Sequence, residues 1–224
     1  MNHQDILKKA TKEIESLKGQ TLDVLDIKKP HSTAYAQHLA KVVSKISPLL
    51  GSRGLQNFSL RPREAWANWL ICVVLRHMHK RDITFMEDDK GDGFIVDKER
   101  IVIVATEHVS ALNIPKGKKL PSGEQRVIDA IDLKIARGIE YAKDKLLVVF
   151  FDGAGEFYRN KIRESIFGRH GFEAVFCVGL LDSGENGYSY SVTEFRNSFG
   201  DQSVTHKVEI NGDFTDWKIF QVMR

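Results

Sequence analysis

The 224-residue chain has only two cysteines, Cys72 and Cys177, and several common motifs are missing from it. Both cysteines lie in apolar runs, so we expect buried, reduced thiols. No C-x-x-C pair occurs, which argues against a cysteine zinc site. The sequence also lacks G-x-S-x-G, H-E-x-x-H, G-x-G-x-x-G and a P-loop lysine. These absences disfavour serine hydrolases, zinc peptidases and nucleotide-binding proteins.

Long hydrophobic runs and a large excess of one charge are absent as well. No apolar run approaches the length needed to span a bilayer, and the polar N-terminus shows no secretory signal. We therefore expect a cytoplasmic protein that does not enter a membrane. The formal net charge is +3, which permits nucleic-acid binding without requiring it.

The composition is that of an ordinary globular protein, with 42% hydrophobic and 28% charged residues. Residues 1–54 are predicted to form a helical N-terminal extension or subdomain, because apolar residues recur at helical spacing over 3–18 and 34–50. Gly51-Ser-Arg-Gly54 then interrupts the pattern. Residues 55–224 are predicted to form one α/β domain.

The pattern within residues 55–224 predicts alternating helices and strands. The predicted helices cover residues 62–79, 123–143 and 156–167, the second capped by Ser122. A strand over 83–86, a hairpin over 92–109, buried strands over 146–151 and 172–181 and an edge strand over 188–195 are predicted, with two short β-like pieces after 200. The first three strands suit a meander, and the later strand–helix–strand unit should be parallel. Together they predict a mixed central sheet flanked by helices.

The hairpin carries an acid at each end, Asp92 and Glu107. Strand side chains alternate between faces, so a turn with its tip at Lys98-Glu99 places both acids on one face as diagonal neighbours, roughly 7–8 Å apart. Two carboxylates so placed suit a hard divalent cation such as Mg²⁺ or Mn²⁺. The alternative is that both are simply solvated. His108 points to the opposite face by the same alternation, and we expect a structural role for it.

The order helix, three-strand meander, helix and strand, with Asp-Gly at the second strand and Glu ending the third, resembles the PD-(D/E)XK nuclease superfamily over residues 62–151. The resemblance implies a restriction-endonuclease-like αβββαβ core and Mg²⁺-dependent cleavage of DNA. It also implies that Asp92 and Glu107 bind the metal and are catalytic. Val109 stands where the family has a lysine that positions or activates the attacking water.

Two further residues are candidates for this site. Lys134, in the helix after the hairpin, could supply the missing basic group, and the alternative is a surface lysine with a buried stem. Glu64, in the helix before the meander, is a candidate outer metal ligand. It is equally a first-turn acid favoured by the helix dipole.

Basic residues elsewhere are candidates for contact with nucleic acid. Arg159, Lys161 and Arg163 lie along the predicted basic helix, and Lys118 and Lys119 lie in the loop after the hairpin. Such residues suit phosphate contacts, although an ordinary solvated surface has the same composition. Symmetric cleavage of a duplex would suit a homodimer.

The sequence thus favours a metal-dependent endodeoxyribonuclease. A catalytically inactive protein of the same fold, binding nucleic acid or acting as a scaffold, is the alternative that Val109 suggests. A small-ligand or protein-interaction domain is a third hypothesis.

Overall fold

The protein is built around an eight-stranded sheet whose strands lie in the order β1 to β8. The computed structural model describes residues 61–86, 92–111, 121–151, 158–184, 187–199, 202–212 and 216–222. The strands are β1 (Ile83–Met86), β2 (Phe94–Asp97), β3 (Val102–Ser110), β4 (Lys145–Phe150), β5 (Ala174–Gly184), β6 (Gly187–Phe195), β7 (Val204–Asn211) and β8 (Trp217–Gln221). The predicted extension 1–54 and its boundary lie outside the described residues, as do Lys118 and Lys119.

The sheet is mixed. Strands β1, β2 and β3 form an antiparallel meander, β4 runs parallel to both β3 and β5, and β5 to β8 are antiparallel. The predicted α/β class, with a mixed sheet flanked by helices, is confirmed.

The prediction that residues 188–195 form an edge strand is wrong, because β6 pairs with β5 on one side and β7 on the other. That prediction depended on the alternation of polar and apolar residues along the segment. Ser191 and Thr193 are nevertheless buried, and the Thr193 and Thr205 hydroxyl oxygens hydrogen-bond at 2.9 Å. Internal hydrogen bonding of this kind lets polar side chains occupy a buried strand.

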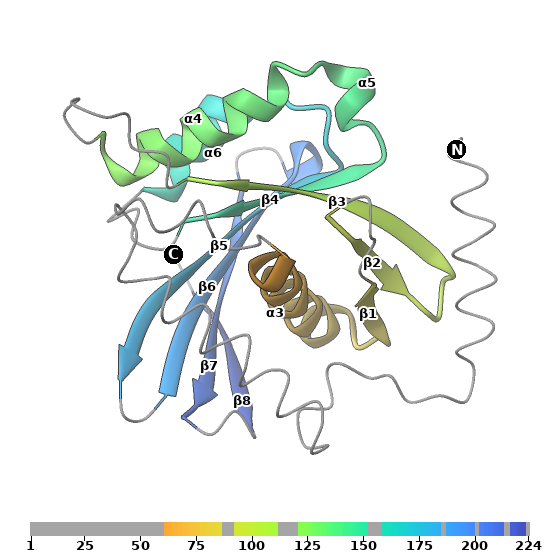
Figure 1. Ribbon diagram of the computed structural model, residues 1–224, viewed down its shortest axis with the longest axis vertical. Coiled ribbons are helices and arrows are strands. Elements are labelled where there is room, and N and C mark those ends of the chain that lie inside the picture. The colour runs from red at the N-terminus through yellow and green to blue at the C-terminus, as the bar shows by residue number, and fades with distance from the viewer. Residues whose placement is uncertain are drawn as a thin grey trace.

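One face of the sheet curls around α3 (Arg61–His79), as Figure 1 shows. Every residue from Trp66 to Leu75 is buried, as expected for a helix that is apolar nearly all round. Trp66 and Trp69 stack with ring centroids 4.9 Å apart. No helix in the described part of the chain has both the length and the apolar composition to cross a membrane.

Three helices cover the other face: α4 (Gly123–Ile135), α5 (Ile139–Ala142) and α6 (Arg159–Ile166) (Figure 1). Ser122 caps α4 as predicted, accepting the Gln125 N–H at 3.3 Å. The single helix predicted over 123–143 is wrong, because the chain turns between α4 and α5 at Gly138, whose φ is +94°. Ile139 begins α5 and is 72% exposed.

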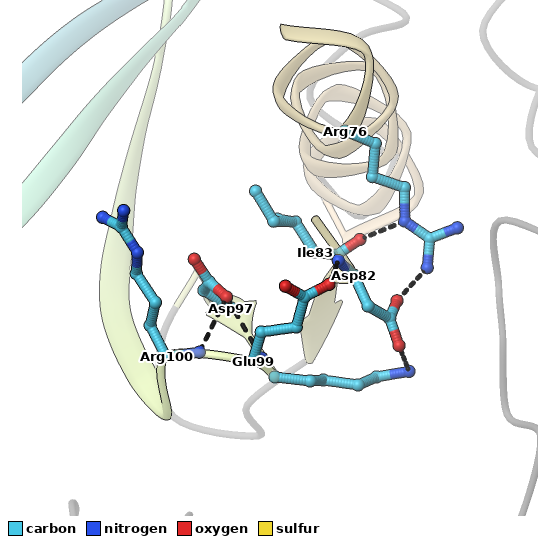
Figure 2. A network of polar contacts seen from close by, with 7 residues as sticks. Arg76, Asp82, Ile83, Asp97, Glu99 and Arg100 are labelled. Atoms are coloured by element: carbon cyan, nitrogen blue, oxygen red, sulfur yellow. Dashed lines mark hydrogen bonds and ion pairs between the residues drawn. The ribbon is translucent and has the colours of Figure 1, made fainter. Parts of the chain in front are cut away.

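The β2–β3 hairpin has a four-residue turn, 98–101, since Asp97 pairs with Val102. Figure 2 shows the cause: Asp97 Oδ1 accepts the N–H groups of Glu99 at 3.2 Å and Arg100 at 3.1 Å. A carboxylate that accepts nearby backbone N–H groups stabilises a turn. The predicted tip at Lys98-Glu99 is therefore wrong: the turn is centred one residue later, on Glu99-Arg100.

The wider turn shifts the pairing of the strands by two residues. Phe94 pairs with Ala105 rather than with Ile103. A shift by an even number keeps every side chain on its predicted face. The pairing ends at Phe94 and Ala105, so the diagonal placement of Asp92 and Glu107, which lies beyond it, stays a prediction.

Gly93 is required where the chain enters β2. Its φ is +103°, and a Cβ atom there would lie 2.8 Å from the Met86 carbonyl oxygen. A glycine beside a carboxylate can admit a ligand, but here the close contact is with the protein's own backbone. Gly91 lies outside the described residues.

We expect Gly93→Ala to lower the free energy of unfolding by about 1–3 kcal/mol, because it adds a clash to an unfavourable φ. Urea denaturation measures this effect. Gly138→Ala is the matched control, since Gly138 has φ +94° and open space around it. Equal losses in the two variants would show that the contact with Met86 contributes nothing.

Candidate active site

Asp92 is held at the end of the β2–β3 ladder. The ladder continues from Phe94 to Gly93, whose carbonyl accepts the Thr106 N–H at 2.9 Å. Beyond Gly93 the acceptor is a side chain: Asp92 Oδ2 accepts the His108 N–H at 2.6 Å. The Asp92 side chain therefore replaces a backbone acceptor and lies against β3.

The backbone of Asp92 is anchored as well. Its carbonyl oxygen accepts hydrogen bonds from Thr106 Oγ1 at 2.9 Å and from Asn68 Nδ2 of α3 at 3.2 Å. The same Asn68 carries its Oδ1 3.0 Å from His108 Nε2. Helix α3 and strand β3 thus fix the position of Asp92 from two sides.

Glu107 projects from β3 toward the helices α4 and α5, where it forms an ion pair with Lys134 Nζ. Lys134 follows Val127 and Ile131 on the buried stripe of α4, and all three are buried. The side chain of Lys134 therefore turns inward rather than to the surface. Of the two predicted orientations, into the site or out to the surface, the structure shows the first.

The site contains three residues that the sequence did not reveal: Arg137, Tyr141 and Lys145. Tyr141 lies beside Glu107 and helps to lower the pKa of that carboxyl, and Arg137 Nη1 donates to the Tyr141 hydroxyl at 2.9 Å. Arg137 Nη1 also lies 3.9 Å from Glu107 Oε1. Lys145 Nζ lies 4.1 Å from the centroid of the Tyr141 ring. Gly138, a common signal for the end of a helix, could have predicted the turn that brings them here.

The two acids have pKa values displaced in opposite directions. Burial raises the pKa of Asp92, and the Glu107 charge raises it further. These effects outweigh the His108 N–H, Lys134 and Arg137, which act to lower that pKa. Burial would also raise the pKa of Glu107, but Lys134, Tyr141 and Lys145 outweigh it and lower that pKa. Two carboxylates that repel each other in a partly buried place favour a bound cation.

His108 lies on the α3 face, as the alternation predicted. Burial and the charge of Lys134 lower its pKa to about 3. The imidazole is therefore neutral over the physiological range. Its ring contacts Asn68 rather than the two acids, which supports the expected structural role.

The residues that could hold a metal here are Asp92 and Glu107. No cluster of three or more His, Cys, Asp and Glu side chains suited to a metal occurs within the described ranges. Glu64 lies in the first turn of α3, and its role as an outer ligand stays a prediction. A pair of carboxylates still fits Mg²⁺, which commonly keeps several water ligands beside one or two carboxylates.

The predicted basic helix is shorter than expected, and its cations have partners within the protein. Arg159 donates to Thr205 Oγ1 at 2.7 Å, Lys161 pairs with Glu124 at 3.0 Å, and Arg163 lies 3.8 Å from Glu164. Glu124 is ten residues before Lys134 on α4, about 15 Å along the helix. This basic surface is therefore set apart from the two acids, and its contact with nucleic acid stays a prediction.

Comparison with known proteins gives no relative: no family model, curated protein or solved structure matches this chain. The chemistry of the site must therefore be inferred from its own groups. Asp92 and Glu107 can bind a hard cation, and Lys134 and Arg137 can neutralise negative charge beside it.

Proposed function

We propose that this protein hydrolyses phosphodiester bonds of DNA in a reaction that needs Mg²⁺ or Mn²⁺. One observation carries the proposal: Asp92 before β2, Glu107 of β3 and Lys134 of α4 come from three elements and converge on one site. The order α3, β1, β2, β3, α4, β4 is also the one that the resemblance to PD-(D/E)XK nucleases implies, and it supports the proposal.

Each residue has a part in this reaction. Asp92 and Glu107 would hold the cation, which when bound polarises the phosphate and lowers the pKa of a ligated water. Lys134 sits against Glu107, where its ammonium group can orient the attacking water or neutralise charge on the phosphate. Lys134 would thereby supply the basic group that a lysine provides in the family and that Val109 cannot provide.

The test is incubation of the protein with plasmid DNA and with single-stranded DNA, each with Mn²⁺, with Mg²⁺ and with a chelator. We expect nicked or linear plasmid, or shortened single strands, only where a divalent cation is present. DNA that stays intact under every condition would refute the proposal.

A second candidate is a protein of this fold that binds nucleic acid without cutting it. The observation that favours it is that Glu107 already has partners in the protein, Lys134 and Tyr141, while Val109 packs into the core on the α4 side. This candidate predicts DNA affinity that falls with salt, and no cleavage with either cation.

A further inference from the structure

Two cations approach the same carboxylate of Glu107, and they differ in exposure. The Lys134 side chain is 9% exposed, whereas the Arg137 side chain is 54% exposed. Lys134 is in hydrogen-bond contact with Glu107, while Arg137 Nη1 stays 3.9 Å away. Of these two cations, Arg137 is therefore the one that a ligand from solvent reaches more readily.

Tyr141 holds Arg137 in this place. Its hydroxyl accepts the hydrogen bond from Arg137 Nη1 at 2.9 Å, and the same side chain lies beside Glu107. The Arg137 guanidinium also lies 5.0 Å from the Tyr141 ring centroid. Tyr141 thus links the exposed cation to the acid.

The guanidinium has donors to spare. Within the part of the chain that the structure describes, its hydrogen bonding is to the Tyr141 hydroxyl, and a guanidinium carries five N–H donors in a planar fork that fits two phosphate oxygens. Three cations, Lys134, Arg137 and Lys145, lie close to Glu107.

We propose that Arg137 binds a phosphate of the DNA strand beside the Asp92–Glu107 site, and that Tyr141 is the residue that positions it. The ligand class, a phosphodiester, rests on the proposed function. The DNA strand would then reach the carboxylates from the side of the α4–α5 turn, where Arg137 lies.

The experiment measures binding without cleavage. A fluorescein-labelled duplex oligonucleotide is titrated by anisotropy at several salt concentrations, with Ca²⁺ in place of Mg²⁺, for the wild type and Arg137→Gln. We expect the slope of log affinity against log salt to fall by about one in the variant, because one phosphate contact is lost. Arg137→Lys should keep the slope and bind more weakly, because lysine keeps the charge but loses the fork.

Two further variants complete the test. Lys98→Gln removes the same charge from the hairpin turn, where Lys98 pairs with Asp82 at 3.0 Å, and it should leave the slope unchanged. Tyr141→Phe keeps the ring and loses the hydroxyl. It should weaken DNA binding when Arg137 is present, but it should cause little further loss of binding in the Arg137→Gln variant. If the role of Tyr141 were purely structural, Tyr141→Phe would lower DNA affinity equally with Arg137 present and in the Arg137→Gln variant.

The outcomes separate the two proposals. An unchanged slope in Arg137→Gln, an equal fall in Lys98→Gln, or no DNA binding by the wild type at low salt would overturn the inference. A wild-type protein that never cleaves DNA would refute the proposed hydrolysis. The phosphate contact would stand in that case if Arg137→Gln still lowers the slope.

Discussion

Asp92→Asn is expected to abolish metal-dependent cleavage and, at the same time, to stabilise the folded protein at pH 7. Residues that merely orient metal ligands contribute about 10–100-fold to affinity or activity, so loss of a ligand should lower the cleavage rate by at least about 100-fold. Asparagine keeps an oxygen that can accept the His108 N–H. The fold should therefore survive the change.

The gain in stability follows from the pKa of Asp92. Burial and the nearby Glu107 raise this pKa above its ordinary value of 3.8, so the charged form is less favourable in the folded chain than in the unfolded one. The penalty is absent below the unfolded pKa and grows as the pH rises through the folded pKa. Asparagine removes it, so the variant should exceed the wild type in free energy of unfolding at pH 7 and lose this advantage in acid.

Urea denaturation across this pH range, with plasmid cleavage at neutral pH, measures both effects. Asp97→Asn is the matched control, because Asp97 is a buried acid that pairs with Arg81 away from the site. It should lose stability and keep its cleavage. Asp92→Asn that cleaves like the wild type, or that loses stability at pH 7, would contradict the assignment of Asp92.

Lys134→Met is expected to reduce both cleavage and stability. Loss of a charge positioned for the transition state costs about 100- to 1000-fold in rate. The Glu107 carboxylate, whose side chain is 17% exposed, loses its closest partner, and a poorly satisfied buried group costs about 1–3 kcal/mol. Plasmid cleavage and urea denaturation at pH 7 measure the two losses.

The loss of stability should depend on pH. Burial acts to raise the pKa of Glu107, but Lys134 and Tyr141 lower it overall from its ordinary 4.5, so the pair contributes stability above the unfolded pKa and loses it as the pH falls through the folded one. The gap between wild type and Lys134→Met should therefore close in acid. In the double variant with Glu107→Gln the second change should recover stability at pH 7, and a simple sum of the two single losses would contradict the coupling.

Much of the fold follows from local patterns in the sequence. Strand β1 has its predicted bounds, and α3 begins one residue earlier than predicted. Continuous apolar runs predicted β4 and β5 correctly as buried parallel strands. These features depend on hydrophobic periodicity over short windows, which the sequence displays directly.

The errors occur where a contact distant in sequence or a single backbone angle decides the outcome. β6 is internal because β7 and β8 add to the sheet beyond it, and polar side chains such as Thr193 find partners there. The helix predicted over 123–143 is divided by the positive φ of Gly138. The hairpin turn is longer because the Asp97 carboxylate organises it.

By itself, the sequence predicted that Glu107 ends an apolar strand and that Lys134 lies beside the buried stripe of the following helix, because strand and helix periods set these positions locally. The inward turn of Lys134 to Glu107 was decided by the tertiary structure. Only the tertiary structure decided that Asp92 takes the place of a ladder acceptor, and that Arg137 and Tyr141 join Glu107. Those contacts depend on the strand register and on the turn after α4, which result from packing of the whole sheet against its helices.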